Sequence, residues 1–69
     1  MEEIFKTNVT HTADASQLMQ QLLGRHPESR ISFDLEDCDR VLRIEGNEVC
    51  ATGIIELMSE AGYLCEVLE

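Results

Sequence analysis

The stretch from Val41 to Leu68, VLRIEGNEVCATGIIELMSEAGYLCEVL, constrains the fold more than any other part of the chain. It opens with β-branched and aliphatic residues, breaks at Gly46, and then places apolar residues on one side of a helix. Those apolar residues recur at i, i+4, i+7, i+8 and i+11: Cys50, Ile54, Leu57, Met58 and Ala61. Gly62 ends that helix, and Tyr63–Leu68 is typical of a closing strand. The stretch therefore predicts a strand, a turn, a helix and a strand.

Two earlier stretches alternate in the manner of strands. Residues Ile4–Val9 place Phe5 and Val9 on one side, which we expect to face the core. Residues Arg30–Glu36 alternate more strictly and predict a second strand. Its inward side chains are expected to be Ile31, Phe33 and Leu35. The acidic turn Glu36–Arg40 then leads into the strand described above, so the second and third strands should form a hairpin.

A first helix is expected between these two strands. Asp14 and Gln17 have the spacing of a capping box, which places the start of the helix there. Gly24 and Pro27 are expected to end it. Its apolar stripe is predicted to consist of Ala15, Leu18, Met19, Leu22 and Leu23.

The resulting order, βαββαβ, limits the topology. A right-handed crossover makes the first two strands parallel, with the third antiparallel between them and the fourth beside the first. We predict one α+β, ferredoxin-like domain over residues 1–69, with a four-stranded antiparallel sheet in the order 4-1-3-2 and both helices on one face. Three connections should meet at one end of this sheet: Thr10–Ala13, the Glu36–Arg40 hairpin and Gly62.

Charge and cysteine content exclude several classes of function. A formal net charge of −9 repels phosphate backbones and anionic lipids, so nucleic acid and membrane surfaces are not expected as partners. Cys38, Cys50 and Cys65 are odd in number and lack CxxC spacing, and the N-terminus does not resemble a signal peptide. A cytoplasmic location fits these thiols best. No apolar run approaches the ~20 residues that a membrane span needs.

Three segments of the chain resemble the second half of heavy-metal-associated domains. They are SFDLE at Ser32–Glu36, RIEG at Arg43–Gly46 and GIIELMSEAGYLCEVLE at Gly53–Glu69. Those domains are small ferredoxin-like modules of copper chaperones and metal-transporting ATPases, and they commonly read V-x-V-D-L, V-x-V-x-G and E-I-I-E-x-I-x-x-A-G-Y. The likeness covers residues 30–69 well and residues 1–29 only in the order of elements. It implies the fold predicted above.

The resemblance ends where that family binds metal. Its members hold a soft metal ion with M-x-C-x-x-C, whose second cysteine lies in the first turn of the first helix. The corresponding residues 10–16, THTADAS, contain no cysteine. Because Cu(I) prefers two nearby thiolates, we do not expect binding of Cu(I) in the manner of the family.

Substitute metal ligands are the alternative at this end of the sheet. His11 and Asp14 could offer an imidazole and a carboxylate to a harder divalent ion, with Cys38 of the hairpin as a third ligand. The interpretation we favour is a solvated histidine, a helix cap and an exposed turn. Cys50 could be a reactive thiol at a helix N-terminus, but we expect a capping position instead. We expect Tyr63 to pack near the loop that contains His11, and Cys65 to lie in the core.

Nothing in the sequence predicts an enzyme, because it has neither a phosphate-binding glycine loop nor a nucleophile elbow. The first hypothesis is a non-enzymatic module that has lost Cu(I) binding through CxxC and acts through contact with a protein partner or as a homodimer. The second is a carrier or sensor of divalent transition metals that uses His11, Asp14 and Cys38. No cofactor is expected beyond weak binding of such a metal. A regulatory domain that binds a small molecule is a third and weaker hypothesis.

Overall fold

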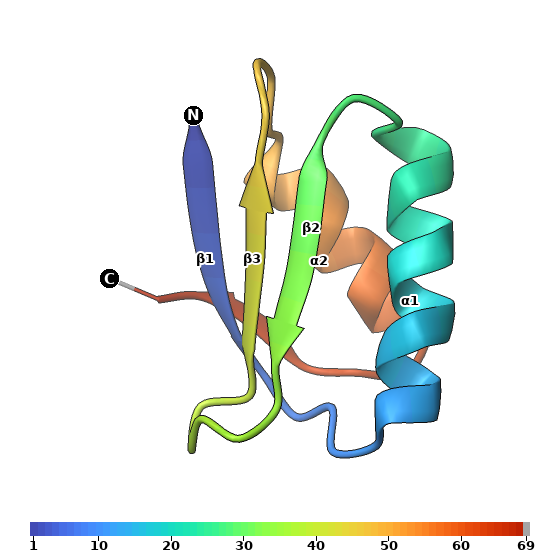
Figure 1. Cartoon of the computed structure of the whole chain (residues 1–69), viewed down its shortest axis with the longest axis vertical. Coiled ribbons are helices and arrows are strands. Elements are labelled where there is room, and N and C mark those ends of the chain that lie inside the picture. Colours follow the sequence, from blue (N-terminus) through green and yellow to red (C-terminus); the bar gives the residue numbers. More distant parts are fainter. Residues whose placement is uncertain (69) are drawn as a thin grey trace.

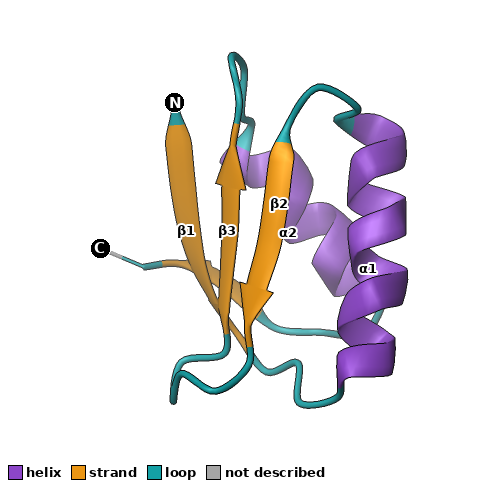
Figure 2. Ribbon diagram, viewed as in Figure 1, coloured by secondary structure: helices purple, strands orange, loops and turns teal. Residues whose placement is uncertain are grey.

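The computed structural model describes residues 1–68. Six elements follow one another in the predicted order βαββαβ (Figures 1 and 2). They are β1 (Glu2–Thr7), α1 (Thr12–Arg25), β2 (Arg30–Asp34), β3 (Val41–Glu45), α2 (Ala51–Glu60) and β4 (Cys65–Val67). Among the described residues, none of the helices is both long and apolar enough to cross a bilayer.

The four strands form one sheet in the order β2-β3-β1-β4, and each neighbouring pair is antiparallel. This is the predicted order 4-1-3-2, with β1 and β2 parallel on either side of β3. One row of side chains crosses the whole sheet, because Leu42 lies opposite both Phe33 and Phe5, and Phe5 lies opposite Val67. The two helices cover the face of the sheet that carries Phe5 and Leu42, since side chains from both helices join these two in one cluster. The predicted fold class is confirmed.

The core lies between this face and the two helices. The side chains that are essentially inaccessible to solvent are Phe5, Val9, Leu22, Leu42, Ile44, Ile54 and Met58. The sequence correctly predicted that Phe5, Val9, Leu22, Ile54 and Leu57 are buried. It overestimated the burial of β2 and of the residue that follows it, because Ile31, Phe33 and Leu35 are only partly buried against the core. The reason is that β2 lies at the edge of the sheet, where it has a single neighbouring strand.

The ends of the elements differ from the prediction in several places. Helix α1 begins at Thr12 with His11 as its N-cap, and no side-chain hydrogen bond caps it within the described chain, so the predicted capping box at Asp14 and Gln17 is wrong. The helix also continues through Gly24 to Arg25. Three residues of the predicted apolar stripes are exposed to solvent: Leu23, Cys50 and Ala61. The strand β1 lies two residues nearer the N-terminus than predicted because Glu2 pairs with Glu45, the last residue of β3.

Two glycines have the structural roles that their positions predict. Gly62 follows α2 with a φ of +94°, the left-handed conformation that commonly ends helices, and the amide of Tyr63 donates a hydrogen bond to the carbonyl of Met58. Gly46 lies where β3 ends, and a Cβ there would lie 2.6 Å from Oγ of Ser29. The close approach of these two connections therefore favours glycine, since any other residue would displace the hydroxyl of Ser29.

Candidate functional site

Three connections meet at one end of the sheet, as the topology predicted: the β1–α1 loop, the β2–β3 hairpin and the segment between α2 and β4 (Figure 1). Hydrogen bonds join them. The amide of Thr7 donates to the carbonyl of Asp39 over 3.0 Å, and the amide of Leu64 donates to Oδ1 of Asn8 over 2.9 Å. The β1–α1 connection is thus held between the hairpin on one side and the approach to β4 on the other.

Thr7 anchors the hairpin with its side chain. Its hydroxyl is buried and donates a hydrogen bond to the carbonyl of Arg40 over 2.6 Å, while it accepts one from the amide of Val9 over 3.3 Å. Arg40 has a φ of +46°, so a non-glycine residue occupies the left-handed region at the point where the hairpin enters β3. Its guanidinium donates a hydrogen bond back to the carbonyl of Leu35, which closes the hairpin. These bonds fix the position of the hairpin relative to β1.

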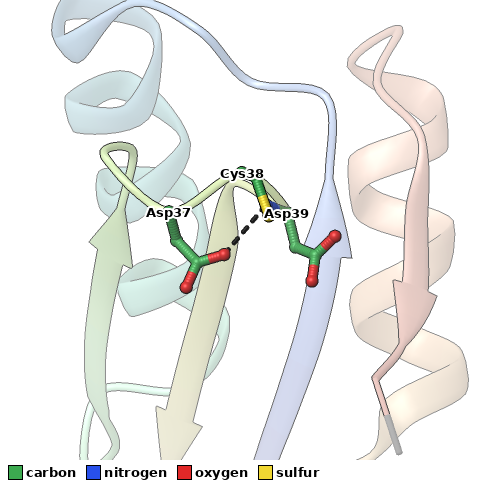
Figure 3. A group of neighbouring side chains, drawn as sticks. All are labelled: Asp37, Cys38 and Asp39. Carbon is green, nitrogen blue, oxygen red and sulfur yellow. Dashed lines mark hydrogen bonds between the residues drawn. The ribbon is translucent and has the colours of Figure 1, made fainter.

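The tip of the hairpin gathers three groups that could bind a metal ion (Figure 3). Ligand atoms of Asp37, Cys38 and Asp39 all lie within 4.8 Å of one another, and Oδ1 of Asp37 accepts a hydrogen bond from the amide of Asp39. Asp37 and Cys38 are exposed, whereas Asp39 is half-buried and lies 3.9 Å from Nζ of Lys6. The sequence pointed to Cys38 but not to Asp37 and Asp39 as its neighbouring ligands.

The structure places the other two candidate ligands elsewhere at this end. Within residues 1–68, neither His11 nor Asp14 belongs to the group around Cys38. His11 is exposed at the N-cap of α1, and Asp14 is half-buried in the first turn. The pKa of the Tyr63 phenol is raised above its ordinary value, first by desolvation and then by the negative charge and hydrogen bonding of Asp14. Tyr63 therefore lies near the first turn of α1.

The three thiols occupy three different environments. Cys38 is exposed in the hairpin, and Cys50 is exposed at the N-cap of α2, beyond the opposite end of β3 (Figure 1). Cys65 is buried, and burial, followed by the nearby charge of Glu66, raises the pKa of its thiol to about 11. The thiolate form that binds soft metals is therefore disfavoured at Cys65. Its predicted place in the core is confirmed.

A groove of about 440 Å³ runs between α1 and β2 near the same end. Ala15 and Met19 line it from the helix, and Phe33 and Leu35 line it from the strand and the residue that follows. Sequence reasoning missed this groove because it treated β2 as fully covered. The available clue was the predicted sheet order itself, which already placed this strand at an edge.

Comparisons with known proteins support the fold and no specific activity. Neither a comparison with models of protein families nor a search of curated proteins gave a match. Among solved structures, the chain is similar to the yeast copper transporter domain CCC2A, whose solution structure was determined in the apo and Cu(I)-loaded states. The TM-score is 0.81 at 24% sequence identity, and the match covers 99% of this chain and 94% of that chain. The fold is therefore that of a domain like the heavy-metal-associated modules.

Proposed function

We propose that the chain is a non-enzymatic, cytoplasmic module with a heavy-metal-associated-like fold that acts through contact with a protein partner, either a different protein or a second copy of itself, and does not hold Cu(I) by a pair of thiolates. One observation carries this proposal. The β1–α1 connection and the first turn of α1, where the resemblance would place two cysteines, contain His11 and Asp14 and no thiol. The thiols of the chain lie in the hairpin, at the start of α2 and in the core, so they form no dithiol at this loop.

The spacing of His11 and Asp14 sharpens this argument. The two residues are three positions apart, as the two cysteines of C-x-x-C are, and they occupy the N-cap and the first turn of α1. An imidazole nitrogen and a carboxylate oxygen are harder ligands than thiolates and select against Cu(I). On this proposal, the loop keeps its place in the fold, but its side chains no longer favour Cu(I).

The second candidate is a carrier or sensor of divalent transition metals. The group formed by Asp37, Cys38 and Asp39 favours it, because three ligand atoms within 4.8 Å approach the number that a tetrahedral site needs. His11 and Asp14 lie at the same end of the sheet but outside that group. An ion would thus bind either to the exposed hairpin or to the loop, with few protein ligands in each case. This arrangement supports weak binding only.

Native mass spectrometry of the untagged protein distinguishes the two candidates, with Cu(I), Zn(II) and Ni(II) added one at a time. The first candidate predicts no Cu(I) complex that survives a competing thiol, and divalent complexes too weak to persist at stoichiometric metal. The second predicts a one-to-one Zn(II) or Ni(II) complex that His11→Ala or Cys38→Ser abolishes. Cys65→Ser serves as the matched control, because this buried thiol lies outside both groups of ligands. A persistent Cu(I) complex of the wild type would overturn the first candidate.

A further inference from the structure

The free edge of β2 is a surface that takes no part in either group of candidate metal ligands. β2 pairs with β3 on one side, and among residues 1–68 no strand pairs with its other side. Helix α1 lies beside it (Figure 1), and the groove of about 440 Å³ separates the two. An edge of this kind presents unpaired amides and carbonyls that favour the addition of another strand.

We propose that two copies of this chain associate through antiparallel pairing of their β2 strands, with Ser32 on the two-fold axis. The inference rests on the proposed function and names the partner and the surface for it. Ser32 is the central residue of the five-residue strand Arg30–Asp34, so this register pairs the two strands over their full length. It places Arg30 of each copy opposite Asp34 of the other.

Charge complementarity favours this register. Within one copy Arg30 lies opposite Glu45, but Asp34 lies opposite Val41 and has no cation across its only strand pair. Pairing of the two β2 strands gives each Asp34 an Arg30 as its cross-strand neighbour, twice per dimer because of the symmetry. Opposite charges at such positions stabilise a sheet, and like charges destabilise it. Glu28 and Glu36 would approach at the two ends, but both lie outside the strand.

The same register also brings apolar side chains together on the face of β2 that points toward the helices. Ile31 and Phe33 point toward the helix side, where they are only partly buried because β2 is an edge strand. Antiparallel pairing about Ser32 places Ile31 of one copy opposite Phe33 of the other, which covers both side chains. The groove beside Phe33, with Met19 on its helical wall, shows that α1 leaves part of this apolar face uncovered.

The opposite edge of the sheet is a poor alternative. β4 has three residues, Cys65–Val67, with Glu66 in the middle. Antiparallel pairing of two β4 strands over their full length would place the two Glu66 carboxylates opposite each other. A contact through the five residues of β2 is itself short, so we expect a weak dimer whose fraction rises with protein concentration.

Sedimentation equilibrium of the full chain, from low concentrations up to about 1 mM, tests the proposal. The wild type is expected to dimerise progressively. Arg30→Asp and Asp34→Arg are each expected to raise the dimer dissociation constant about tenfold, since each creates two like-charge pairs. An equimolar mixture of the two variants should form a heterodimer, and the double variant Arg30→Asp/Asp34→Arg should restore the homodimer. Glu66→Arg, on β4, is the matched control and should not weaken dimerisation.

The charge reversals also separate local pairing from overall charge. Asp34→Arg lowers the net negative charge of the chain, so a purely global effect would strengthen its association, whereas the proposed pairing weakens it. Both residues are exposed, and a urea unfolding curve checks that each variant stays folded. A wild type that stays monomeric throughout, or a dimer that neither reversal weakens, would overturn the proposal. Cu(I) binding is measured in a separate experiment. If the chain does not dimerise, the proposed function still stands. If the wild type retains Cu(I), the proposed function is wrong whatever the oligomeric state.

Discussion

The carboxylate of Asp14, in the first turn of α1, raises the pKa of the phenol of Tyr63, which follows the glycine after α2. The side chains of the first turn of α1 and of the segment between α2 and β4, which are far apart in the sequence, thus lie close enough to interact. Replacement of Asp14 by Asn should lower the pKa of Tyr63, because a negative charge that disfavours tyrosinate is removed. The pKa should stay above the ordinary value of 10.0, since desolvation is the larger cause.

Ultraviolet absorbance measures this pKa directly, because the chain has one tyrosine and no tryptophan. Glu28→Gln is the control, because Glu28 belongs to the connection between α1 and β2, which lies at the opposite end of the sheet (Figure 1), and the change should leave the pKa of Tyr63 unaltered. Identical titration curves for the wild type and Asp14→Asn would show that the two side chains do not interact in solution.

Thr7 provides a second test, of the way the hairpin is held. Thr7→Val keeps the shape of the side chain but removes a donor to the carbonyl of Arg40 and an acceptor for the amide of Val9. The loss of these buried hydrogen bonds should lower the free energy of unfolding by about 1–3 kcal/mol. Thr7→Ser retains the hydroxyl and should cost less than Thr7→Val. Urea unfolding of both variants gives the comparison, and equal losses would mean that the methyl group and not the hydroxyl matters.

The two phenylalanines test the difference between the centre and the edge of the sheet. Phe5 is fully buried on β1, so Phe5→Ala should cost about 3–5 kcal/mol. Phe33 is partly buried on β2, so Phe33→Ala should cost less than Phe5→Ala. Urea unfolding at low protein concentration, where dimers do not contribute, makes the comparison. If Phe33→Ala lowered the free energy of unfolding more than Phe5→Ala does, the centre of the core would lie under β2 and not under β1.

The sequence predicted the elements well because their periodicity is local. The alternation in β2, the helical stripe of α2 and the stop at Gly62 are each readable within a few residues. It failed on the burial of Ile31, Phe33 and Leu35, because burial depends on which strands and helices lie alongside. The start of α1 was misplaced for a different reason: a capping box with Asp14 as the N-cap fits the spacing rule, but the N-cap is His11, three residues earlier, and no side chain of the described residues caps the helix there.

The site was predictable in outline and not in detail. Topology alone brings the β1–α1 loop and the hairpin to one end of the sheet. It does not reveal that Thr7 binds the carbonyl of Arg40, because the two residues are 33 positions apart and their contact depends on strand register and on the conformation of Arg40. The grouping of Asp37 and Asp39 around Cys38 likewise follows from the turn that the hairpin adopts.

The buried thiol of Cys65 predicts a loss of stability at high pH. Its pKa is about 11 in the folded chain against an ordinary value of 9.0, so the unfolded chain releases this proton first as the pH rises. The contribution of this group is complete below about pH 9 and is lost as the pH approaches 11. Unfolding curves between these limits should show a shallower decline for Cys65→Ala than for the wild type. Cys50→Ala, which alters an exposed thiol, should follow the wild-type decline.

The retention of Cu(I) in the presence of a competing thiol, for the wild type and for His11→Cys/Asp14→Cys measured side by side, tests the central claim. The double variant restores two thiols at C-x-x-C spacing at the N-cap and first turn of α1. The account predicts that the wild type loses its Cu(I) to the competitor, while the double variant retains one Cu(I) per chain. Retention of stoichiometric Cu(I) by the wild type would contradict it.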